Sequence, residues 1–225
     1  VPAVKGTAKV KLSVLSGSNP MRLDMVSMAW NKPRPLPDLK TATFPVPNYV
    51  YNIMNQNHHA DPQADLVIII PTSQKLLKQA QRLKAFHEQH DSMTVNLVPA
   101  DELYNEFSSG TPDASAYRRY MKMLYDRSTG ENDRPKYLLL FGDCLWDNRM
   151  ITSHNTGKST DDYLLTFESE NSYDRRVCYI DDSFHAMLDD GEGLKPMYVD
   201  KLDIGVGRFP VVSDAEAKIM VDKTI

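Results

Sequence analysis

The sequence predicts an α/β fold, a three-layer αβα sandwich around a mainly parallel sheet. Two runs are apolar at nearly every position, DLVIIIP at Asp65–Pro71 and YLLLF at Tyr137–Phe141. Such runs are typical of parallel strands that are covered on both faces. Between them, segments with helical spacing alternate with strand-like runs. This alternation predicts parallel strands joined by helical crossovers, with helices on both faces of the sheet.

Composition and charge exclude several classes of protein. The chain is 41% hydrophobic and 25% charged, with a net charge of −4, which is ordinary for a globular protein. Lysine and arginine never cluster beyond a doublet, which argues against a nucleic-acid partner or an anionic membrane. No apolar run reaches the roughly 18 residues of a membrane helix. The chain opens VPAVKGTAK, without an initiator methionine or a signal peptide. We therefore expect an excised piece of a longer protein.

Residues 1–48 are predicted to be the end of a β-rich domain followed by a linker. Polar and apolar residues alternate in Lys9–Leu15 and in Arg22–Trp30, which predicts an antiparallel hairpin. A lone hairpin is marginally stable, so it either ends a β-rich domain or packs as an extra layer on the αβα subdomain. Five prolines between positions 33 and 47 predict an extended linker. Residues 49–225 then form the αβα subdomain.

Three elements are expected after the first strand. Thr72 and Ser73 are predicted to cap a helix over Gln74–Gln89, whose apolar residues recur at helical spacing. Thr94–Pro99 is predicted to be the second strand. Asp101–Phe107 has the pattern of a short helix.

Another helix is expected to begin at about Ser115, ahead of the strand Tyr137–Phe141. Its predicted buried stripe is Tyr117, Tyr120, Met121, Leu124 and Tyr125.

A long, weakly patterned stretch begins after Asp147 and runs to about Val199. Tyr163–Phe167 and Val177–Ile180 are predicted to be short strands within it. Stretches of this length are usually functional or disordered. Leu202–Phe209 is predicted to be a further strand, and Ser213 is predicted to cap a last helix.

Taken together, these segments resemble the gingipain-type cysteine peptidases. Within that family they are most similar to the signal peptidases (sortases) of the type IX secretion system of Bacteroidota. The resemblance extends over Asp65–Ile225, and its ordered motifs are Val98–Arg118, Leu138–Arg149 (LLLFGDCLWDNR), Asp181–Gly193 (DDSFHAMLDDGEG) and Leu202–Lys223 (LDIGVGRFPVVSDAEAKIMVDK).

The resemblance implies a caspase-like fold of two subdomains and a Cys–His dyad. In such enzymes a thiolate activated by an imidazole attacks the peptide carbonyl, and backbone N–H groups hold the oxyanion. In the family a helix follows the GRFP motif, and the catalytic histidine stands after that helix in a Gly-His-Gly turn. The catalytic cysteine comes later in the chain. No Gly-His-Gly occurs here, where the histidines are His58, His59, His87, His90, His154 and His185.

The function implied is therefore the N-terminal portion of a cysteine endopeptidase, inactive by itself. The parent would act on polypeptides, as the sortases do on C-terminal sorting signals, and would need no cofactor. The resemblance places it outside the cytoplasm, at the cell surface or the periplasmic side of the outer membrane, with outer-membrane secretion proteins as further partners. The alternative is a non-catalytic αβα module that binds or organises partners at the cell surface.

Candidate site residues come just after the strand Tyr137–Phe141, because ligands collect at the carboxyl ends of parallel strands. Cys144 is either a nucleophile, with His154 or His185 as its base, or a small residue that fills space beside a turn. The family usually carries glycine at this position, which favours the second role.

Several loop carboxylates are expected to support the site or to bind an ion. Asp143 and Asp147 are expected either to shape the edge of the site by accepting backbone N–H groups or to orient a group in the cleft, and a supporting role is favoured over direct catalysis. Asp182 is expected to support the same edge. Arg208 is expected to pair with a loop aspartate and so fix its strand. Calcium is the ion that would suit the acidic loop, but no EF-hand spacing occurs, which favours solvated loop charge instead. The calcium candidates are Asp181, Asp182, Asp189, Asp190 and Glu192.

Overall fold

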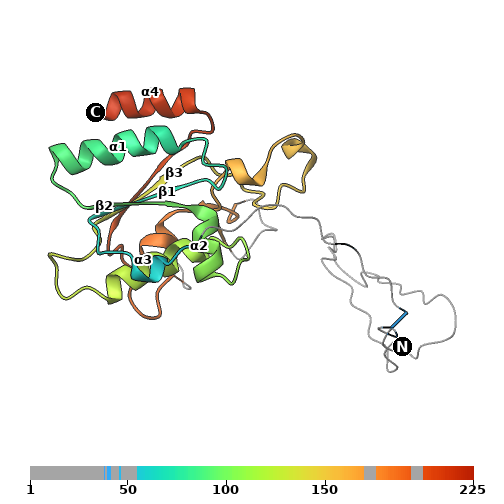
Figure 1. Ribbon diagram of the computed structural model, residues 1–225, viewed down its shortest axis with the longest axis horizontal. Coiled ribbons are helices and arrows are strands. Elements are labelled where there is room, and N and C mark those ends of the chain that lie inside the picture. The colour runs from blue at the N-terminus through green and yellow to red at the C-terminus, as the bar shows by residue number, and fades with distance from the viewer. Residues whose placement is uncertain (1–37, 39, 42–45, 47–54, 170–175, 194–199) are drawn as a thin grey trace. The chain divides into compact units, whose positions relative to one another are not determined.

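A computed structural model describes residues 38, 40–41, 46, 55–169, 176–193 and 200–225 (Figure 1). The chain divides into two units, Val1–Ile53 and Met54–Ile225. The hairpin predicted over residues 9–30 lies outside the described residues. The domain boundary near residue 48 stays a prediction.

The second unit is built on a four-stranded parallel sheet. Its strands are β1 (Leu66–Ile70), β2 (Val95–Pro99), β3 (Tyr137–Phe141) and β6 (Gly205–Phe209), in the spatial order β2-β1-β3-β6. All three neighbouring pairs are parallel. The predicted α/β fold with a mainly parallel sheet is therefore confirmed.

Helices cover both faces of this sheet (Figure 1). On one face lie α1 (Leu77–His90) and α4 (Asp214–Thr224), which pack on each other, and on the other lie α2 (Ala100–Phe107) and α3 (Ser115–Asp126).

The sequence of β1 supplies both cores, because alternate residues of a strand point to opposite faces. Val67 and Ile69 belong to the core under α2 and α3. Leu66, Ile68 and Ile70 belong to the core under α1 and α4. A strand that is apolar at every position is thus buried at every position, as the sequence predicts.

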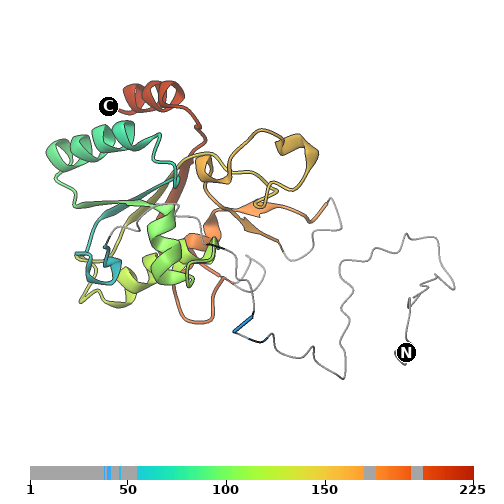
Figure 2. The same cartoon turned by 45° about the vertical axis from the view of Figure 1, so that its right-hand side comes forward.

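The long stretch after β3 forms short helices and a small hairpin. The strands β4 (Phe167–Glu168) and β5 (Ile180–Asp181) pair antiparallel, a few residues later than predicted. Figure 2 shows this hairpin beside the loop that precedes it, both projecting from one side of the sheet. The short 3₁₀ helices of the unit are η1 (His58–Ala60), η2 (Ser153–Asn155), η3 (Thr160–Asp162) and η4 (Ser183–Ala186).

One of the two predicted helix caps is wrong. The helix α1 begins only at Leu77, and its N-cap residue, Leu76, makes no side-chain cap. No helix starts at Ser73 because the next residue, Gln74, has a φ of 54°, outside the helical region. The N–H of Ser73 donates to the carbonyl of Asp161, 2.8 Å away in a later loop. The cap of α4 is confirmed, since Ser213 forms a reciprocal capping box with Glu216.

Exposure also differs from expectation at the start of β3. Tyr137 is 52% exposed although its run is apolar throughout. The strand β6 also begins later than expected, at Gly205 rather than Leu202.

Among the described residues, the structure contains no helix of the length and apolarity that a membrane crossing requires.

Candidate functional site

The crevice expected at the carboxyl edge of the sheet is filled by the chain's own loop. The order β2-β1-β3-β6 reverses direction between β1 and β3, where α/β sheets usually bind ligands. At that point a Cβ on Gly142 would lie 2.8 Å from Cγ of Pro71 and 3.2 Å from Cγ of Leu164. Leu164 is 1% exposed, and its N–H donates to the carbonyl of Asp143 at 2.9 Å. Only glycine fits position 142 without displacing these neighbours.

An arginine clamp joins three segments at this edge. Arg208 on β6 forms two hydrogen bonds to Asp182, from Nε at 2.8 Å and from Nη2 at 2.6 Å. Its Nη1 donates to the carbonyl of Gly142 at 2.9 Å. The Arg208 side chain is 9% exposed and that of Asp182 is 28% exposed, so the pair is largely shielded from water. The pairing of Arg208 with a loop aspartate, expected from the sequence, is confirmed.

Cys144 lies beside this clamp and has none of the features of an activated thiol. Burial raises the pKa of the thiol, and the positive charge of Arg208 only partly offsets this effect. A raised pKa disfavours the thiolate, which is the nucleophilic form. Cys144 is a free cysteine, and the hydrogen bonds found among the described residues do not join it to a histidine.

Neither histidine considered as its base has the geometry of one. His154 is exposed on η2. His185 is fully buried in η4, and neither of its ring nitrogens has a hydrogen-bond partner among the described residues. Burial lowers the pKa of His185 to about 4, so the ring is neutral at physiological pH. These positions favour the space-filling role of Cys144.

Asp143 and Asp147 bind backbone N–H groups of the turns after β3. Oδ1 of Asp143 accepts the N–H of Cys144 at 2.9 Å. Oδ2 of Asp147 accepts the N–H of Thr152 at 2.8 Å and an amide hydrogen of Asn155 at 3.0 Å. The hydrogen bond from Thr152 is the main reason why the pKa of Asp147 falls to about 2. Both carboxylates therefore hold the local turns, in keeping with a supporting role.

The calcium candidates do not gather at one place. Asp182 is engaged by Arg208, and Asp190 pairs with Lys122 at 2.8 Å. Asp181 accepts the N–H of Ser183 at 2.8 Å.

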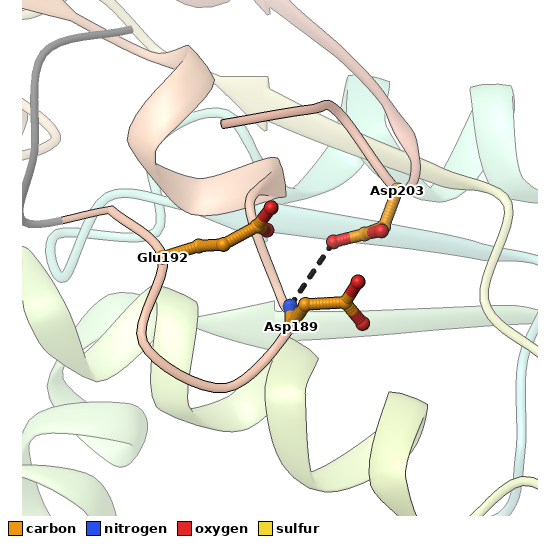
Figure 3. Close-up of side chains that lie close together, drawn as sticks. All are labelled: Asp189, Glu192 and Asp203. Carbon is orange, nitrogen blue, oxygen red and sulfur yellow. Dashed lines mark hydrogen bonds between the residues drawn. The ribbon is translucent and has the colours of Figure 1, made fainter. Parts of the chain in front are cut away.

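The remaining two candidates meet a third carboxylate that the sequence reasoning missed. Carboxylate oxygens of Asp189, Glu192 and Asp203 all lie within 4.8 Å of one another (Figure 3). Asp203 accepts the backbone N–H groups of Leu188 and Asp189, the latter at 3.2 Å, and so closes this loop. Carboxylate oxygens are the ligands that calcium takes. Calcium at Asp189 and Glu192 stays an expectation, and Asp203 is a further carboxylate beside them.

An open groove of about 510 Å³ lies at the opposite, amino edge of the sheet. It lies where β3 and β6 begin, and Tyr137, Leu202 and Gly205 are among its lining residues. The ring of Tyr137 rests on Gly205, where a Cβ would lie 2.9 Å from Cδ1 of the tyrosine. No pattern in the sequence predicts this groove, because it depends on which strand neighbours β3.

The fold and the Arg208 clamp define an α/β domain in which Cys144, among the described residues, lacks the geometry of an activated nucleophile. The chain belongs to peptidase family C25, whose family model matches residues 59–225. The gingipain-type family predicted from the motifs is therefore confirmed.

A solved structure supports the same family. The crystal structure of dimeric latent PorU from Porphyromonas gingivalis matches with a TM-score of 0.64 and 38% sequence identity. The match covers 76% of this chain and 16% of the PorU chain, so the chain spans about a sixth of the length of that protein. A comparison with curated proteins finds no match.

Proposed function

We propose that this chain is a portion of a C25 cysteine endopeptidase and that residues 54–225 form one wall of its active site. The family match over residues 59–225 and the 38% identity to PorU support a peptidase. The observation that carries the view of an incomplete site is the state of Cys144, a half-buried thiol with a raised pKa and without a histidine partner among the described residues. In this proposal the nucleophile and its base do not come from Cys144 and the described histidines.

The proposed parent acts as a sortase of the type IX secretion system and cleaves C-terminal sorting signals of exported polypeptides. The similarity to PorU supports this role. The proposed location is the cell surface or the periplasmic side of the outer membrane, where outer-membrane proteins of the secretion system are the further partners.

The purified 225-residue chain is expected not to hydrolyse peptides. Fluorogenic peptides that cover basic, acidic and apolar residues before the scissile bond measure this, with Cys144→Ala as the matched control. Both proteins should give the buffer rate, because a thiol with a raised pKa offers little thiolate at neutral pH. Turnover that disappears in Cys144→Ala would overturn the assignment and make Cys144 the nucleophile.

The sortase role predicts a defect in the cell that carries the gene. Removal of the gene should leave exported proteins with their C-terminal sorting signals attached, detected by mass spectrometry as an increase in mass. Restoring the gene should restore cleavage. Complete cleavage without the gene contradicts the sortase role and favours a scaffolding module, while the family assignment stands.

A further inference from the structure

The imidazole of His58 is held between two carboxylates near the start of the second unit. Nδ1 lies 2.8 Å from Oδ2 of Asp61, and Nε2 lies 2.7 Å from Oε2 of Glu102 on α2. The side chains of His58, Asp61 and Glu102 are 13%, 23% and 25% exposed. Both ring nitrogens therefore face an acceptor in a place where water only partly screens the charges.

With both carboxylates ionised, this geometry favours a protonated ring. A neutral imidazole carries one N–H and one lone pair, so it can donate to only one of two carboxylates. Its lone pair would then face a carboxylate oxygen at hydrogen-bond distance, which is repulsive. An imidazolium donates at both nitrogens, and hydrogen bonds between charged groups are about twice as strong as neutral ones.

The other groups around His58 are one further carboxylate, one tyrosine that contacts the ring and one arginine that binds backbone carbonyls. Glu106 on α2 accepts the backbone N–H of His58 at 2.8 Å. Tyr120 on α3 packs edge-on against the ring, 6.1 Å between centroids, and donates its hydroxyl to Asp61 at 2.7 Å. The positive charge nearby, Arg127, binds the carbonyls of His59 and Asp61.

The same segment makes further contacts with α2 that do not depend on the charge of His58. Gln56 donates to the carbonyl of Glu102 at 2.7 Å and to Oε1 of Glu106 at 2.8 Å. His59 bonds Oε2 of Glu106 through Nδ1 at 2.7 Å. Residues 55–61 are thus fixed to α2 through Glu102 and Glu106. Of these contacts, the one between the His58 ring and Glu102 depends on whether the His58 ring is protonated.

We propose that His58 is a protonation-dependent latch that fastens residues 55–61 to helix α2. Burial by itself would lower the pKa of His58, but the hydrogen bonds and charges of Asp61 and Glu102 outweigh burial and raise the pKa. A group whose pKa is raised by folding contributes its full stabilisation below its unfolded value, here 6.5. The latch therefore holds in mildly acidic conditions and loosens as the pH rises through the raised pKa of His58.

Titration of the 225-residue chain by NMR tests the latch directly. The His58 ring should titrate above pH 6.5. Amide-exchange protection of residues 56–61 should fall about tenfold between about pH 6 and about pH 9, as expected for loss of one hydrogen bond to a charged group.

Glu102→Gln is the matched variant. The amide of glutamine donates to Nε2 of a neutral His58 while Nδ1–H donates to Asp61, so both contacts persist without the extra proton. The pKa of His58 should fall relative to the wild type, and protection of residues 56–61 should no longer change with pH. Titration of wild-type His58 at or below pH 6.5 overturns the proposal, and so does the same pH response of protection in both proteins. The first outcome needs no variant, so the test does not depend on the folding of Glu102→Gln.

Discussion

Arg208→Ala should lower the free energy of unfolding by about 3–5 kcal/mol, the range for removal of one partner from a buried ion pair. The substitution leaves the Asp182 carboxylate without both hydrogen bonds and the carbonyl of Gly142 without its donor. The side chains are only 9% and 28% exposed, so water replaces few of the lost contacts. Urea unfolding followed by circular dichroism measures the change.

Two further variants make this result specific. Lys75→Ala removes an ion pair with Asp162 whose lysine is 60% exposed, and it should cost about 1 kcal/mol or less. The double variant Arg208→Met with Asp182→Leu should recover much of the lost stability, because apolar groups of similar volume often replace a buried ion pair without loss. If Arg208→Ala costs no more than Lys75→Ala, the clamp does not fix this edge.

Leu164→Ala should cost about 2–5 kcal/mol, the usual range for truncation of a buried leucine. Leu164 is 1% exposed and fills the crevice beside Gly142 where β1 and β3 end. The cavity left behind cannot collapse easily, because Pro71 and Gly142 directly follow β1 and β3, whose pairing holds their backbones in place. Urea unfolding again measures the loss.

The same variant should make the thiol of Cys144 easier to label. Cys144 comes directly after Asp143, whose carbonyl accepts the N–H of Leu164, so a looser loop uncovers this turn. The rate of reaction with a disulfide reagent in the native state should increase. Ile151→Ala, in the same stretch but 75% exposed, is the control and should change neither stability nor labelling. Unchanged stability in Leu164→Ala would show that the crevice is not closed by this side chain.

The elements with strong periodicity could be predicted from the sequence. Burial at every position of β1 is a consequence of the run Leu66–Ile70, and the stripe of α3 is buried at Tyr117, Tyr120, Met121 and Leu124. Ser213 and Glu216 stand at the spacing of a capping box, which needs no tertiary contact. The expected cap at Ser73 is wrong because Gln74, with a φ of 54°, takes the chain out of the helical region directly after it.

The sequence by itself determined the order of strands and helices along the chain, the two buried faces of the sheet and the peptidase family. Hydrophobic periodicity and ordered motifs are local properties of the chain. The tertiary structure alone decided which charged groups from separate segments lie together. It pairs Arg208 with Asp182 and His58 with Glu102, and it brings Asp189 and Glu192 close to Asp203. These partners are up to 44 residues apart, and their meeting depends on strand order and loop closure, which no local spacing encodes.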